Sequence, residues 1–134
     1  MRGLHPLRVA GPGRAIIAGG FTTVNGANPT AINGWGISSI VRDGEGLWTV
    51  TLIDPVVQID AVLVDIALED LPGSGANENV NCFVDQDTIT TQAFQIEVTT
   101  VDDTSANAPA ASDEPGSYIS FVVVAKLTSV SDPL

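Results

Sequence analysis

Apolar and polar residues alternate in several short segments of this chain, and glycine, proline and asparagine separate these segments. The most regular alternation covers residues 90–101, in which Phe94, Ile96 and Val98 alternate with polar side chains. A period of two places alternate side chains on opposite faces of a strand, so a half-buried β-strand is predicted here. Residues 117–127 form another such segment, but apolar residues occupy both of its faces. A strand of that kind is either central in a two-layer sandwich or covered by another chain.

The strongest local signal is a predicted hairpin in residues 36–55. Trp48, Val50 and Leu52 fall on one face of its second strand, and threonines fall on the other. The turn is predicted at residues 43–46, where Gly44 and Gly46 can adopt the positive φ angles that hairpin turns require.

Three further strands are predicted at residues 14–24, 56–68 and 80–84. Residues 56–68 also permit a helical spacing of apolar residues, but six β-branched residues among the thirteen favour a strand. Loops are expected at residues 25–35, 69–79 and 102–116, which are rich in turn-forming residues. The pattern predicts an all-β fold, a compact β-sandwich or small barrel of about 6–8 antiparallel strands.

The chain of 134 residues suits a single domain. Residues 1–13 contain prolines, glycines and basic residues but few apolar ones, so an extended basic N-terminal arm is expected there. Residues 14–134 are predicted to form one β domain with a short C-terminal tail. No segment approaches the ~20 apolar residues of a membrane span, and no membrane association is expected.

Charge is distributed unevenly along the chain. Sixteen acidic and five basic residues give a formal net charge of −11, and only Lys126 among the basic residues follows Asp43. An acidic body of this kind repels phosphate, which argues against a nucleic-acid partner. The basic arm suggests contact with an acidic protein surface, whereas the simpler interpretation is that acidity keeps the protein soluble.

Residues with catalytic or metal-binding chemistry are few. His5 and Cys82 are the only residues of their types, which excludes an intrachain disulfide and a cysteine–histidine zinc cluster. Neither has a suitable partner for catalysis, so no enzymatic activity and no cofactor are expected. The carboxylates at 85, 87, 102 and 103 could bind calcium, but solvated turn residues are the favoured interpretation. Trp35 and Trp48 are candidate sugar platforms, or anchors of the core or of an interface.

The hairpin block at residues 40–52, together with residues 91–100 and 117–125, resembles small virion proteins of tailed bacteriophages. In those proteins a glycine-rich turn, an aromatic residue and Thr-Val-Thr precede an acidic middle and a final Phe-Val-Val-Val type of strand. The chain looks like a head decoration (cement) protein or the base domain of a head fibre. The resemblance implies a homotrimer on the outer surface of the capsid that bridges subunits of the major capsid protein.

On this hypothesis the partner contacts come from the arm, from the last strand and from the tryptophans. The arm would anchor through its arginines, and the outer valines of the last strand would pack protomers together. The residues assigned to partner binding are Arg2, Arg8, Arg14, Trp35, Trp48, Val122 and Val124. The alternative function is a carbohydrate- or receptor-binding β module of a phage fibre or tail, which would use the tryptophans and the acidic loops.

Overall fold

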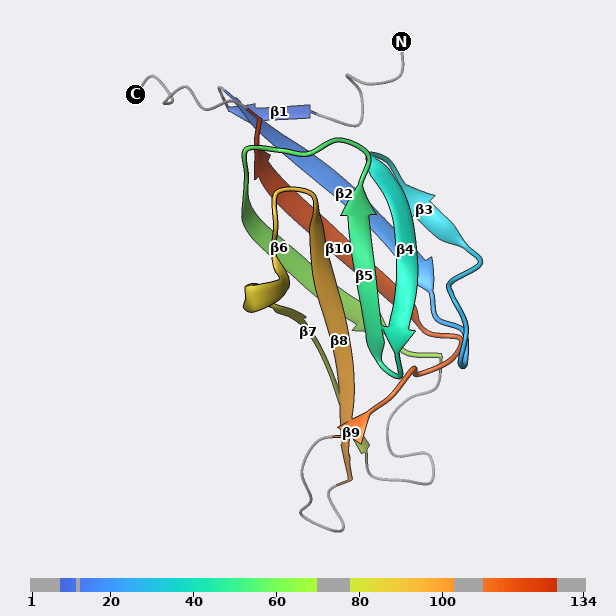
Figure 1. Ribbon diagram of the computed structural model, residues 1–134. Helices are drawn as coiled ribbons and strands as arrows, with labels where there is room; N and C mark the ends of the chain where they lie inside the picture. Colours follow the sequence, from blue (N-terminus) through green and yellow to red (C-terminus); the bar gives the residue numbers. More distant parts are fainter. Residues whose placement is uncertain (1–7, 12, 70–77, 103–109, 128–134) are drawn as a thin grey trace.

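Two antiparallel β-sheets pack face to face, with β4, β5 and β8 of one layer crossing over β2, β10 and β6 of the other (Figure 1). This computed structural model describes residues 8–11, 13–69, 78–102 and 110–127. One short 3-10 turn, η1 (Gln86–Thr88), accompanies the strands. The strands are β1 (Arg8–Gly11), β2 (Arg14–Thr22), β3 (Ile32–Gly34), β4 (Ile37–Gly44), β5 (Leu47–Leu52), β6 (Gln58–Ala67), β7 (Glu78–Asp85), β8 (Ala93–Asp102), β9 (Ala110–Ala111) and β10 (Tyr118–Lys126).

Sheet one consists of β1, β2, β3, β6 and β10, and sheet two of β4, β5, β7, β8 and β9. In sheet one the order is β1-β2-β10-β6, with β3 also pairing with β2. In sheet two the order is β4-β5-β8-β7, with β9 pairing with β8. The last strand β10 is therefore central, paired with β2 from Thr22 to Arg14 and with β6 from Ala67 to Gln58. One of the two explanations for the doubly apolar strand, a central position in a sandwich, is therefore observed, and the outer face of β10 is still open to contact with another chain.

The core lies between the sheets and is built from the inner positions of the alternating strands. On β10 the inner residues Ile119, Phe121 and Val123 are at most 2% exposed. Aromatic side chains join the layers: the ring centroids of Phe21 and Trp48 are 5.6 Å apart, and Phe94 meets Phe121 edge-on at 5.5 Å. Each fully buried side chain of this size contributes about 1.5–3 kcal/mol of transfer free energy. The seam between the sheets therefore provides most of the stabilisation.

The prediction of an all-β fold is confirmed, and each of the seven strands expected from the pattern has a counterpart. The ambiguous segment 56–68 contains the strand β6, whose β-branched residues Ile59, Val62, Val64 and Ile66 all face the core. Three short strands were not predicted: β1 lies in the expected arm, β3 in the expected loop 25–35, and β9 in the expected loop 102–116.

The expected arm is partly incorporated into sheet one. Strand β1 pairs with β2 through Arg8↔Ile16 and Val9↔Ala15. Gly13, at φ +69°, permits the tight connection between the two strands, and its carbonyl accepts a hydrogen bond from the Leu127 N–H at 2.7 Å. Residues 1–7 of the predicted arm lie outside the described residues.

Candidate binding surfaces

The outer face of sheet two is mainly polar, and its side chains bond to one another. The Asp43 carboxylate accepts hydrogen bonds from the Thr49 hydroxyl and, at 3.1 Å, from Gln95 Nε2. Thr49 and Gln95 are cross-strand partners, so this cluster spans three adjacent strands. Val41 and Phe83 are exposed apolar residues on this sheet, each 41% exposed. Polar ladders of this kind are typical of a solvated sheet face.

The outer face of sheet one has a different composition. Two successive rows of cross-strand partners across β2, β10 and β6 carry no polar side chain. Leu63 is 68% exposed, more than any other large apolar residue that the structure describes. We call these two rows the apolar face of sheet one. The first row is Ile16, Val124 and Ala61, and the second is Ala18, Val122 and Leu63.

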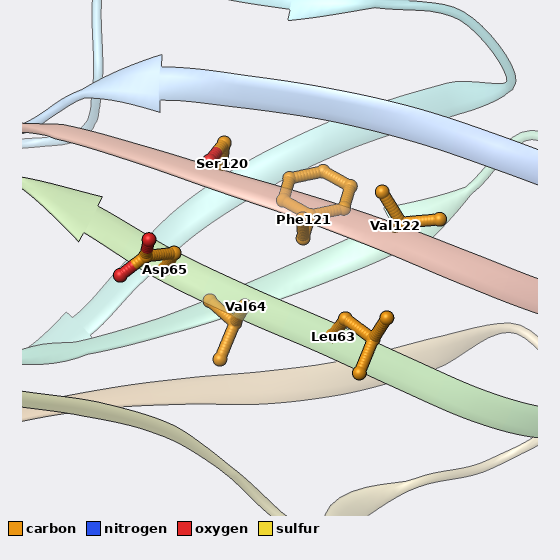
Figure 2. Close-up of a pocket in the computed structure, with 6 residues that line it drawn as sticks. All are labelled: Leu63, Val64, Asp65, Ser120, Phe121 and Val122. Carbon is orange, nitrogen blue, oxygen red and sulfur yellow. The ribbon is translucent and has the colours of Figure 1, made fainter.

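A hollow of about 160 Å³ opens between β6 and β10 on this sheet. Figure 2 shows its lining, in which Leu63, Val64 and Asp65 come from β6 and Ser120, Phe121 and Val122 from β10. Small-molecule sites usually measure roughly 300–1,000 Å³ and enclose their ligand. This open, smaller hollow suits a single side chain of another protein better than a small ligand.

The two ends of the apolar face carry opposite charges. At one end Arg14 and Lys126 are cross-strand partners, and Arg14 Nε forms an ion pair with Asp60 Oδ2 at 2.8 Å. At the other end Asp65 is the partner of Ser120. Lys126 forms no ion pair with any described residue. The face therefore runs from a cationic end through an apolar centre to an acidic end.

The residues assigned to partner binding from sequence fall in different places. Val122 and Val124 point outward at the centre of sheet one, as the assignment requires, and are half-buried by their neighbours. Arg14 lies at the cationic end of the same face. Arg8 belongs to β1, and Arg2 lies outside the described residues.

The interpretation of Trp48 as a partner-binding residue or sugar platform is wrong. Trp48 is 0% exposed, because its position on β5 points toward the core with Val50 and Leu52. Trp35 lies between β3 and β4 and is 46% exposed, near Ile53, whose N–H bonds to the adjacent Gly36 carbonyl. The fold thus places one tryptophan in the core and one at the surface, so they share no binding surface.

Sequence reasoning missed the most strongly bonded carboxylate among the described residues, Asp113. Its side chain is 3% exposed. By its number, Asp113 belongs to the segment that joins β9 to β10, and Figure 1 shows the course of that segment. It accepts hydrogen bonds from the backbone N–H groups of Gly26 at 2.9 Å and Gly46 at 2.8 Å. Arg42 adds contacts through Nε at 3.0 Å and Nη2 at 2.9 Å.

Burial raises the pKa of Asp113, but the hydrogen bonds from Arg42 and from the Gly46 and Gly26 N–H groups outweigh it, so the pKa is lower than usual. Carboxylates with perturbed pKa values often mark active sites. Here both oxygens are already occupied by donors from two other connections of the fold, which leaves no acceptor for a substrate. Asp113 therefore has a structural role, in which it joins the connections that contain Gly26 and Gly46 to its own segment. No local sequence motif identifies it.

The other candidate chemistry also has structural uses. Cys82 lies against the core, and burial, with the Asp65 charge as a second cause, raises the pKa of its thiol to about 12. A thiol of that pKa is a poor nucleophile. The Asp85 carboxylate accepts the Asp87 N–H at 3.0 Å and caps η1. Within the described ranges, no three acidic, histidine or cysteine side chains gather closely enough to hold a metal ion.

No helix in the part of the chain that the structure covers is long and apolar enough to cross a membrane. No protein-family model matches the chain, and no curated protein or solved structure is significantly similar to it.

Proposed function

We propose that this chain is a structural protein of a phage particle, which binds the outside of the capsid as a homo-oligomer and bridges subunits of the major capsid protein. The observation that carries the proposal is the apolar face of sheet one, an adhesive surface on a strongly acidic chain. Contiguous apolar surface with a polar rim is typical of protein–protein contact sites. The resemblance of residues 40–52, 91–100 and 117–125 to virion proteins supports the capsid as the location.

Two different surfaces serve the two contacts in this proposal. The apolar face packs protomers together, as assigned to Val122 and Val124. The basic N-terminal segment, with Arg2 and Arg8, binds acidic capsid surface, where electrostatic complementarity mainly sets orientation and association rate. Oligomerisation then multiplies weak single contacts into stable attachment, because each further contact forms at high effective concentration. The resemblance implies three protomers.

The test is binding of the purified protein to empty, expanded capsids of the phage that encodes it, measured by co-sedimentation. Deleting residues 1–7 is the informative variant, because it removes the first part of the expected arm, with Arg2, and leaves β1 paired with β2. We expect this variant to keep its circular dichroism spectrum and to lose capsid binding. Unchanged binding would remove residues 1–7 from the mechanism. A full-length protein that does not bind capsids at all would contradict the proposed function.

A further inference from the structure

The two ends of the apolar face of sheet one carry opposite charges, and this difference defines what the face can bind. Of the cations whose side chains the structure describes, Arg42 is used by Asp113, and the other two, Arg14 and Lys126, lie together at one end of this face. The opposite end carries Asp65. A surface with one cationic and one acidic end is complementary to itself when a copy is turned end over end.

We propose that this face is the contact surface between two copies of this chain. The copies are related by a two-fold axis that lies between sheet one of one copy and sheet one of the other and runs across the strands. Such an axis reverses the strand direction and brings the cationic end of each copy over the acidic end of the other. Lys126 of each copy then lies over Ser120 of its partner, one strand away from the partner's Asp65 and within reach of its long side chain, twice per dimer. This inference rests on the oligomeric assembly in the proposed function and adds its geometry.

The sizes of the side chains agree with the same arrangement. When the two apolar rows exchange places across the axis, Leu63 of one copy packs over Ala61 of the other, and Ile16 packs over Ala18. Val124 meets Val122. Large residues therefore face small ones, which is how facing layers interdigitate without voids. Leu63 projects beside the hollow of about 160 Å³ that the same face provides (Figure 2).

Charge disfavours the arrangements that keep the strands parallel. A two-fold axis along the strands would place Lys126 over Lys126 of the other copy. A three-fold axis along the strands would bring three Lys126 side chains to one level and three Asp65 side chains to another. Like charges in register disfavour both arrangements. The contact between copies is therefore pairwise and antiparallel, in contrast to the three-fold contact that the resemblance implies.

The size of the face sets the strength of the contact. Strand β10 has nine residues, so the outer surface of β2, β10 and β6, which includes the apolar face and both of its charged ends, covers about 30 Å by about 14 Å, on the order of 400 Å² of projected area per copy. Twice this area is below the roughly 1,200 Å² at which stable specific interfaces begin. We therefore expect a dimer in the micromolar range, so that its dissociation is measurable.

The decisive experiment is sedimentation equilibrium of the full chain across the micromolar range, with charge-reversal variants. Lys126→Glu and Asp65→Lys should each weaken the dimer about tenfold, because each converts two attractive contacts into repulsive ones. A mixture of the two variants should form a heterodimer with near-original affinity, because both contacts regain opposite charges. Ser120, the partner of Asp65, is six positions from Lys126 on β10, which is about 20 Å. At physiological salt the Debye length is about 8 Å, so rescue must act between copies.

A second pair of variants tests the apolar centre. Leu63→Asp should give a monomer at every concentration with an unchanged circular dichroism spectrum, because Leu63 is outside the core. Phe83→Asp, at an exposed apolar position on sheet two, should leave the dimer intact. A monomeric parent protein, a trimer, absence of rescue in the mixture, or equal effects of Leu63→Asp and Phe83→Asp would each overturn the inference. Capsid binding by such a trimer would leave the proposed function standing, whereas capsid binding by a monomer would keep the capsid as partner and remove the oligomer, which separates the two failures.

Discussion

At the scale of single residues, Asp113 joins three connections between strands of this sandwich through its hydrogen bonds to Gly26 and Gly46. Asp113→Asn should lower the free energy of unfolding at pH 7 by about 2 kcal/mol, because it removes charge from a carboxylate with four hydrogen-bond contacts. Asp43→Asn is the matched control at an exposed carboxylate, and it should change the stability by less than about 0.5 kcal/mol. Urea unfolding of both variants measures the difference. Equal decreases in the free energy of unfolding for the two variants would contradict the structural role of Asp113.

The same residue gives a pH dependence of known sign. The pKa of Asp113 is lower in the folded protein than its ordinary value of 3.8, so its contribution is complete above that value and is lost as the pH falls through the folded pKa. The stability difference between the parent protein and Asp113→Asn should therefore be constant from pH 7 to pH 5 and shrink below about pH 4. Urea midpoints at several pH values measure it. A difference that grows on acidification would contradict the assignment.

At the scale of elements, the hairpin β4–β5 depends on one of its two turn glycines. Gly46 has φ +66°, and an added Cβ would lie 2.4 Å from the Val98 carbonyl oxygen. Gly44 has open space around the added atom. Gly46→Ala should thus cost about 3 kcal/mol, through strain and displaced backbone, whereas Gly44→Ala should be nearly neutral. Thermal unfolding of the pair measures this, and similar midpoints would refute the role of Gly46.

The strands themselves were predictable because their signal is local. Alternation over six or more residues places one set of side chains inward, as in β8 and β10, and needs no knowledge of the partner strand. The short strands β1, β3 and β9 carry no such alternation and form only because β2 and β8 offer free edges. The alternation likewise places Trp48 on the same face as Val50 and Leu52, but only the packing of sheet one against this face decides that it is buried.

The candidate surface was only partly predictable. The apolar outer positions Val122 and Val124 are visible in the sequence, because they extend the apolar character of the last strand to both faces. Leu63 and Asp65 could not be assigned to the same surface, because the pairing of β6 with β10 joins residues more than fifty positions apart. The Arg42–Asp113 pair spans 71 positions and likewise has no local signature.

At the scale of the whole molecule, the net charge of −11 opposes any association between copies. This repulsion acts over long distances, whereas the Lys126–Asp65 contacts and the apolar burial act at contact range. Raising the salt concentration from about 0.01 M to 0.15 M shortens the Debye length from about 30 Å to about 8 Å, which removes the repulsion first. The dimer should therefore become tighter over this interval.

Near 1 M salt the ion pairs are screened as well, but the apolar contribution remains, so the affinity of the dimer should fall only slightly. Sedimentation equilibrium at three salt concentrations measures this course, with Leu63→Asp as the monomeric control. An affinity that falls continuously from the lowest salt would mean that ion pairs, rather than burial of the sheet face, hold the copies together.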